Sequence, residues 1–202
     1  MEIKKYSIFC NNSTQNPPLC GIDEAGRGPI AGDLVFAGVI LNRRIQNLND
    51  SKKISEKNRK KLFDKIKLNS NYYIYTISAY KIDKFGLSMC IKEALLAIKA
   101  FFGESVVYLY DGNSSFGVEN IHTLIKADEK IKEVSAASIL AKVYRDSLMC
   151  KYDKLFPQYG FAKHKGYGTK EHLEAIKKYG YSPIHRRSFQ IKSLYEQKGL
   201  FD

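Results

Sequence analysis

The chain has 202 residues, of which 44% are hydrophobic and 27% charged, a composition typical of an ordinary folded protein. It has no run of the roughly 18 apolar residues that a membrane span requires, and residues 1–7 lack the apolar core of a signal peptide. The formal net charge of +12 favours a polyanionic partner, most simply nucleic acid, although charge that serves solubility alone would give the same number.

The strands and helices follow from hydrophobic periodicity, taken along the chain after a flexible lead at residues 1–18. Five segments have the pattern of strands: 19–23, 32–41, 72–79, 106–110 and 121–125. Four have the pattern of helices: 56–68, 87–102, 134–151 and 169–179. This order predicts an α/β fold in which helices flank a mixed five-stranded sheet, with a helical extension at the C-terminus.

Acidic residues follow three of the expected strands. The first strand ends at Asp23 and Glu24, the fourth at Asp111 and the fifth near Asp128. If these strands are parallel neighbours, the four carboxylates converge at one edge of the sheet. Oxygen donors of this kind suit Mg²⁺ or Mn²⁺, and two such ions support phosphodiester hydrolysis. Taken singly, Asp111 could equally belong to a turn and Asp128 to a solvated loop.

A glycine turn, Gly26-Arg27-Gly28, comes directly after the first pair of acids. Glycine lets the backbone approach a ligand closely. Adjacent acids at the end of a buried strand are unfavourable unless cations compensate their charge. The combination predicts a metal site beside a backbone-lined recognition turn.

The helix expected at 134–151 carries a polar stripe formed by Ser135, Ser138, Lys142 and Arg145. Hydroxyls beside cations suit phosphate oxygens, which favours phosphate contact over an ordinary solvated face. Lys52 follows a strand and a loop and is expected to reach the same site.

The cysteines and histidines do not have the spacings of zinc sites. The cysteines are far apart, as is typical of reduced thiols in a cytoplasmic protein: Cys10, Cys20, Cys90 and Cys150. The histidines are expected to be structural or to face phosphate: His122, His164, His172 and His185.

Several motifs, taken in order, resemble ribonuclease HII, the type 2 ribonuclease H of bacteria, over residues 19–190. They are Gly21-Ile22-Asp23-Glu24-Ala25-Gly26-Arg27-Gly28-Pro29, Asp50-Ser51-Lys52-Lys53, Asp111-Gly112, residues 135–142 with Arg145-Asp146, His164-Lys165-Gly166-Tyr167, and His185-Arg186 with Ser188-Phe189. The resemblance implies a ribonuclease H-like catalytic domain at 19–150 and a helical region at 151–202 that contributes to substrate binding.

The resemblance also implies an endonuclease that cuts the RNA strand of RNA–DNA hybrids and single ribonucleotides in duplex DNA, leaving 5′-phosphate and 3′-hydroxyl ends. Ribonucleotide removal from DNA and RNA primer removal would be its roles. Two Mn²⁺ or Mg²⁺ ions would be held by the four acids: Asp23, Glu24, Asp111 and Asp128. The substrate would be contacted by Gly26, Arg27, Gly28, Lys52, Ser138, Lys142, Tyr167 and Arg186. Tyr167 would pack on the sugar, and the glycine turn would recognise the 2′-hydroxyl, the group that separates RNA from DNA locally.

Two other classes of protein fit parts of the pattern. A binding module for RNA–DNA duplexes would not need four acids near phosphates, and a nuclease of the same fold that acts on DNA alone would not need the glycine turn with Tyr167. The C-terminal Gln197, Leu200 and Phe201 resemble the peptide with which replication proteins bind the sliding clamp, although a frayed terminus is the commoner explanation. No heptad or exposed apolar run demands a dimer, so a monomer is expected.

Overall fold

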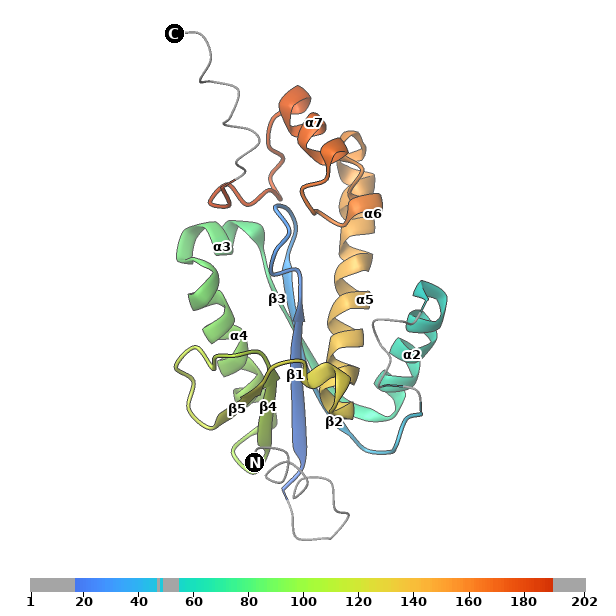
Figure 1. Cartoon of the computed structure of the whole chain (residues 1–202), viewed down its shortest axis with the longest axis vertical. Coiled ribbons are helices and arrows are strands. Elements are labelled where there is room, and N and C mark those ends of the chain that lie inside the picture. The colour runs from blue at the N-terminus through green and yellow to red at the C-terminus, as the bar shows by residue number, and fades with distance from the viewer. Residues whose placement is uncertain (1–16, 47, 49–54, 191–202) are drawn as a thin grey trace.

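The computed structural model describes residues 17–46, 48 and 55–190 of the chain. Its centre is a five-stranded mixed sheet in the order β3-β2-β1-β4-β5 (Figure 1). The strands are β1 (Leu19–Ala25), β2 (Leu34–Leu41), β3 (Ser70–Ile77), β4 (Val107–Asp111) and β5 (Ile121–Leu124). β1 is antiparallel to β2 and parallel to β4, and β4 is parallel to β5, so the predicted α/β fold with a mixed sheet is confirmed.

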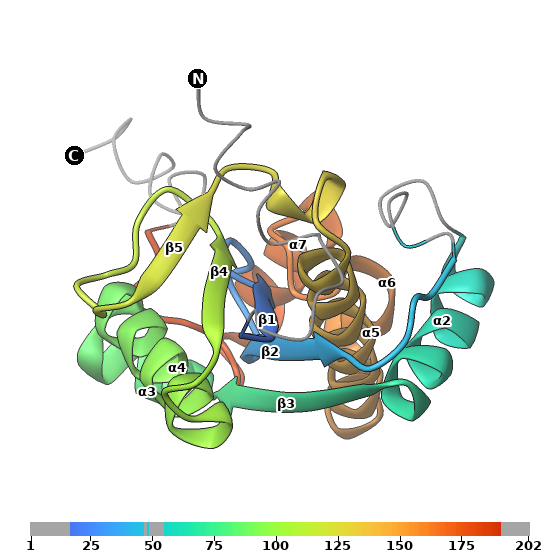
Figure 2. The same cartoon turned by 90° about the horizontal axis from the view of Figure 1, so that it is seen from below.

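Helices cover both faces of the sheet (Figure 2). One face is covered by α3 (Ala79–Phe85) and α4 (Leu87–Phe102), and the other by α2 (Glu56–Leu68) and α5 (Lys132–Leu155). Beyond one end of the sheet lie α6 (Phe161–His164) and α7 (Lys170–Tyr179). Short 3₁₀ turns, η2 (Ala127–Glu129) and η3 (Pro157–Tyr159), precede α5 and α6.

Helix limits follow the capping residues of the sequence. The hydroxyl of Ser55 accepts the amide N–H of Asn58 at the start of α2, and Thr169 caps α7 in the same way. The strand expected at 72–79 was displaced by two residues, because Ser78 ends β3 and caps α3, a short helix that periodicity did not predict. Helix α5 extends past residue 150, the expected domain limit, so a division there stays a prediction.

Helix α5 lies very close to β1, and small residues make this possible. Ala136, Ala137 and Ala141 of α5 are fully buried against the sheet. A Cβ atom on Gly21 of β1 would lie 2.2 Å from the backbone of Glu133 and Val134. The close packing predicted from the small residues is confirmed, and it brings the first turns of α5 beside the end of β1.

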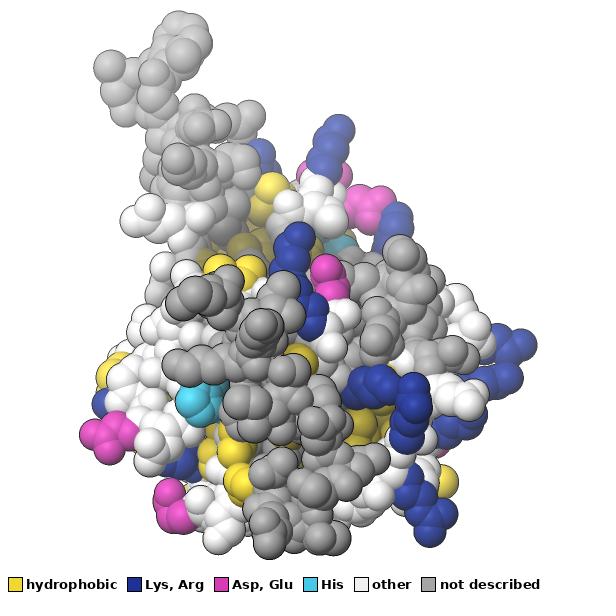
Figure 3. Space-filling view, turned by 60° about the horizontal axis from the view of Figure 1, so that its bottom comes forward, with side chains coloured by type: hydrophobic (Ala, Val, Ile, Leu, Met, Phe, Trp, Pro, Cys, Tyr) yellow, Lys and Arg dark blue, Asp and Glu magenta, His cyan; other side chains and the backbone are white. Residues whose placement is uncertain are grey.

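In the described residues, no helix is long and apolar enough to span a membrane. Lys and Arg side chains gather at the right of the view in Figure 3, on the side of the molecule that carries α2. This distribution agrees with a polyanionic partner.

Candidate active site

Three of the four predicted acids meet at the carboxyl ends of β1 and β4. One carboxylate oxygen each from Asp23, Asp111 and Asp128 lies within 4.8 Å of the others. The register explains the first two: Ile22 of β1 is opposite Tyr110 of β4 in a parallel pair, so Asp23 and Asp111 are neighbours that point to the same face. Asp128 comes from the 3₁₀ turn that precedes α5. The predicted convergence is therefore confirmed for these three.

Glu24 is turned away from this group. Successive strand residues point to opposite faces, so Asp23 faces α5 while Glu24 faces the side of Tyr110. The Tyr110 hydroxyl donates a hydrogen bond of 2.8 Å to a Glu24 carboxylate oxygen, and the Arg27 guanidinium lies 3.7 Å from the other. Glu24 is close enough to Asp111 for that charge to help raise its pKa.

The environment of these acids opposes negative charge. Burial raises the pKa of Asp23 well above its usual range, and the neighbouring Glu24 raises it further. Burial also raises the pKa of Glu24. The Ser138 hydroxyl hydrogen-bonds Asp23, and the amide N–H of Ala127 donates to Asp111 at 3.1 Å. Clustered, desolvated carboxylates of this kind are a donor set that fits a hard divalent cation.

The turn beside the acids has the geometry that glycine provides. Gly26 has φ of +97°, and a Cβ there would lie 2.1 Å from the Arg145 guanidinium. Arg27 and Gly28 are exposed, and the Arg27 guanidinium lies 5.7 Å from the centre of the Phe116 ring. The turn thus presents backbone and one arginine toward solvent, next to the acids.

Arg186 was predicted to contact the substrate, and the structure corrects this. Its side chain is fully buried, and its guanidinium donates to the carbonyls of Gly32 and Arg27 at 2.7–3.2 Å. The guanidinium thus bonds the backbone within the glycine turn, at Arg27, and four residues after it, at Gly32. Arg186 therefore supports the turn. A single sequence does not distinguish a buried arginine in this role from an exposed arginine that contacts substrate.

The polar stripe of α5 is only partly a surface feature. Ser135 is buried, and its hydroxyl donates a hydrogen bond to the carbonyl of Leu48. Arg145 is buried too, and donates to the carbonyls of Ala31, Asp33 and Lys165. The prediction that these two residues contact phosphate was wrong. Their hydrogen-bond donors already bond backbone carbonyls in loops whose positions the sequence alone does not reveal.

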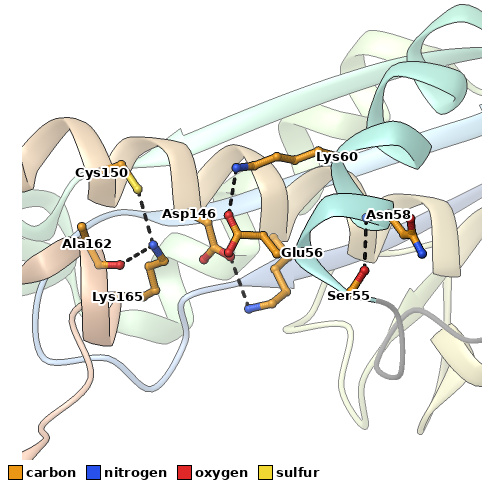
Figure 4. Close-up of polar contacts among 9 residues, drawn as sticks. Ser55, Glu56, Asn58, Lys60, Asp146, Cys150, Ala162 and Lys165 are labelled. Carbon is orange, nitrogen blue, oxygen red and sulfur yellow. Dashed lines mark hydrogen bonds and ion pairs between the residues drawn. The ribbon is translucent and has the colours of Figure 1, made fainter.

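Lys142 remains exposed and pairs with Asp146 at 3.7 Å. Asp146 lies in the seam between α5 and α2, where Glu56 and Lys60 form an ion pair of 2.8 Å (Figure 4). Farther along α5, where it meets α6, the Lys165 ammonium donates to the carbonyl of Ala162 and contacts the Cys150 thiol. Lys52 lies outside the described residues.

Tyr167 lies on the loop between α6 and α7, with 52% of its side chain exposed. Two residues before it, the carbonyl of Lys165 accepts a hydrogen bond of 2.9 Å from the buried Arg145. The amides of Ile30 and Ala31 donate to the carbonyl of Gly166, so this loop is bonded directly to the end of the turn.

Comparisons with known proteins decide the family. The family model described as "Ribonuclease HII" matches residues 20–192. The chain is 59% identical over 177 residues to a ribonuclease HII of Campylobacter hominis, which covers 87% of this chain and 96% of that protein. The chain belongs to the ribonuclease HII family. It is thus a type 2 ribonuclease H, an endonuclease that acts on RNA–DNA hybrids and needs divalent metal ions.

Two further relatives agree. A ribonuclease HII of Sulfurovum sp. is 53% identical over 182 residues, or 90% of this chain and 96% of that protein. The solved structure of a PCNA:RNase HII complex from Archaeoglobus fulgidus has a TM-score of 0.74 and 25% identity over 86% of this chain and 96% of that chain. The ribonuclease H-like fold expected from the motifs is confirmed.

Three of the four histidines form a buried cluster in this protein, so for them the structural alternative holds. The rings of His164 and His172 stack with centroids 4.2 Å apart, and Nε2 of His172 lies 3.0 Å from Nε2 of His185. Burial lowers the pKa of His172 and of His185 to about 4. Both rings are consequently neutral over the ordinary pH range.

We expect this cluster to make folding sensitive to acid. The unfolded chain binds protons on these histidines near pH 6.5, whereas the folded chain resists until about pH 4, so stability is complete above 6.5 and falls between these values. At pH 5 the free energy of unfolding should be lower by about 2 kcal/mol for each histidine. Urea titrations of the wild type and of His185→Gln at pH 7.5 and pH 5 measure this, since buried carboxyls with raised pKa values act equally in both proteins. Equal pH dependence in the two would contradict the expectation.

Proposed function

We propose that this enzyme cuts duplex DNA at single embedded ribonucleotides as well as cutting RNA–DNA hybrids, by hydrolysis that leaves 5′-phosphate and 3′-hydroxyl ends. Ribonucleotide removal and primer removal, in the cytoplasm, are the roles that such an activity serves. The observation that carries the proposal is the group of Asp23, Asp111 and Asp128 oxygens within 4.8 Å, directly beside the Gly26-Arg27-Gly28 turn. Hydrolytic groups and a ribose-recognising turn are then adjacent.

The proposed metal ligands are Asp23, Asp111 and Asp128, whose oxygens converge, with Glu24 on the other face of β1 as the fourth. The proposed cofactor is Mn²⁺ or Mg²⁺, two ions in the catalytic complex. When bound, such ions supply an activated water and neutralise charge at the leaving oxygen. Tyr110 and Arg27 hold the Glu24 carboxylate, Ser138 holds Asp23 and the Ala127 amide holds Asp111, so these three acids are oriented before the substrate arrives. Residues that are preorganised in this way do not have to reorganise during the reaction.

Selection of ribose would fall to the turn and to Tyr167. The backbone of Gly28 is open to a ligand, since this residue is exposed and a Cβ on it would meet no atom within 4 Å. Only the 2′-hydroxyl distinguishes the two sugars locally, and a backbone N–H or C=O can bond it. The half-exposed Tyr167 ring would pack against the same sugar, and Lys142 would contact phosphate from α5. Region 151–202 would contribute to binding through Tyr167.

A duplex with one ribonucleotide tests the proposal. We expect metal-dependent cleavage at the ribonucleotide in the presence of Mg²⁺ or Mn²⁺, none after chelation, and none of an all-DNA duplex. Binding should weaken steeply as salt is raised, because phosphate contacts release counterions. Equal cleavage of the all-DNA duplex would refute 2′-hydroxyl selection.

We also propose that Gln197, Leu200 and Phe201, which lie outside the described residues, contact a sliding clamp, and that the enzyme is a monomer. The relative from Archaeoglobus fulgidus was solved in complex with PCNA, which supports a clamp partner. Deletion of residues 197–202 should abolish retention on immobilised clamp and leave cleavage of a short duplex unchanged. Retention that survives the deletion, or its absence in the full chain, would reject the contact.

A further inference from the structure

The buried histidine cluster joins the two loops to which we assign ribose recognition. His185 and Arg186 are consecutive residues. Arg186 donates to the carbonyl of Arg27 in the glycine turn, while His185 bonds His172, which bonds the carbonyl of Tyr167 at 2.8 Å. One dipeptide therefore has a hydrogen-bonded connection to each side of the candidate ribose site.

Backbone donors decide where the protons of the histidine pair lie. The amide N–H of Ser182 donates to Nδ1 of His185 at 2.8 Å, so the proton of this ring is on Nε2. That proton is donated to Nε2 of His172, whose own proton must then be on Nδ1, where it is donated to the Tyr167 carbonyl. The chain of bonds has a single direction, from Ser182 to Tyr167, and both rings must be neutral.

The third histidine is fixed in the same way. The amide N–H of Gly166 donates to Nδ1 of His164 at 3.2 Å, and Nε2 of His164 lies 2.8 Å from the carbonyl of Tyr159. His164 stacks on His172 and so limits rotation of that ring. The cluster therefore fixes the His172 ring, whose Nδ1–H donates to the carbonyl of Tyr167.

The Tyr167 loop needs such support because its backbone is in an unfavourable conformation. Lys165 and Gly166 have φ of +52° and +84°, and a Cβ on Gly166 would lie 2.3 Å from the carbonyl oxygen of Ala31. Strained backbone of this kind persists where neighbouring contacts fix it. The bond from His172 to the Tyr167 carbonyl is one of those contacts.

We propose that His172 and His185 are positioning residues for ribonucleotide recognition, which as a neutral hydrogen-bonded pair fix Tyr167 relative to the Gly26-Arg27-Gly28 turn. The inference rests on the proposed role of Tyr167 at the ribose. It assigns no contact with substrate to either histidine. Their effect on cleavage must pass through Tyr167, and this makes it separable from a general effect on folding.

A double-mutant cycle in the full-length protein tests the proposal, with kcat/KM measured on a duplex that carries one ribonucleotide. The Asn side chain in His185→Asn still accepts the Ser182 amide but is too short for His172, whereas the longer side chain in His185→Gln reaches it. We expect His185→Asn to lower kcat/KM by about 10-fold, as small misplacements in a site do, and His185→Gln to keep most of the activity. In the Tyr167→Ala background, which retains the backbone carbonyl, His185→Asn should change kcat/KM by less than about twofold.

His172→Gln breaks the other end of the chain of bonds and should behave like His185→Asn in both backgrounds, which keeps the test open if one variant does not fold. Glu104→Gln, at an exposed position before β4, is the control and should leave kcat/KM unchanged. An equal loss with and without Tyr167 would overturn the positioning role while leaving the role of Tyr167 intact. If Tyr167→Ala alone has no effect, the proposed ribose contact fails, and the positioning role fails with it.

Discussion

Asp128→Asn should abolish most cleavage while leaving affinity for the duplex unchanged or slightly higher. Asp128 is 2% exposed, and one of its carboxylate oxygens lies within 4.8 Å of oxygens of Asp23 and Asp111, so asparagine removes one of three close negative charges without creating a cavity. Because metal ions contribute several kcal/mol of transition-state stabilisation, kcat should fall by at least about 100-fold. Removal of a negative charge near phosphates does not oppose binding.

Single-turnover cleavage and fluorescence anisotropy, measured on the same labelled duplex, separate these two effects. Glu104→Gln is the matched control, since Glu104 is 82% exposed and precedes β4, at the opposite end of the strand from Asp111. Wild-type cleavage rates in Asp128→Asn would mean that the carboxylate assignment is wrong. Lost affinity with an unchanged rate on bound substrate would contradict it equally.

The second large effect is expected for Arg186→Ala. The Arg186 guanidinium is fully buried and donates to the carbonyls of Gly32 and Arg27, so its truncation leaves buried acceptors without donors. Loss of a buried, multiply bonded charged group costs about 3 kcal/mol of unfolding free energy or more. Arg186→Lys should recover only part of this, because an ammonium cannot bond both carbonyls with the planar fork of arginine.

Urea unfolding measures this effect, and Arg187→Ala provides the control. The side chain of Arg187 is exposed, and its backbone N–H, which donates to Asp83, is retained in the variant. We expect less than about 0.5 kcal/mol of change for Arg187→Ala. If Arg186→Ala were as stable as this control and still inactive, Arg186 would be a substrate contact, as the sequence first suggested, rather than a support of the turn.

Most of the fold could be predicted because local signals agree with the sheet. Capping residues such as Ser55 and Thr169 mark helix starts, and the apolar runs of β1 and β2 are long enough to be unambiguous. Helix α3 was not predicted, because seven residues are too few to show a helical hydrophobic period. In addition, Ser78, which caps α3, fell inside the segment that has the pattern of a strand.

The site was predictable to the extent that it depends on strand ends. Asp23, Asp111 and Asp128 were placed together on that basis, although strand alternation already implied that Glu24 points the other way. The roles of Ser135, Arg145 and Arg186 were not accessible in this way. Helical spacing shows that side chains share a face, but their carbonyl partners lie in loops far along the chain, and only the folded structure brings these together.

The most direct test of the central claim, that the clustered acids form a metal centre, is isothermal titration of the full-length enzyme with Mn²⁺ or Mg²⁺ in the absence of nucleic acid. We expect a binding isotherm for the wild type and for Glu104→Gln, and affinity at least about 10-fold weaker for Asp23→Asn, Asp111→Asn and Asp128→Asn. Equal affinity in all five proteins, or none in the wild type, would contradict the account.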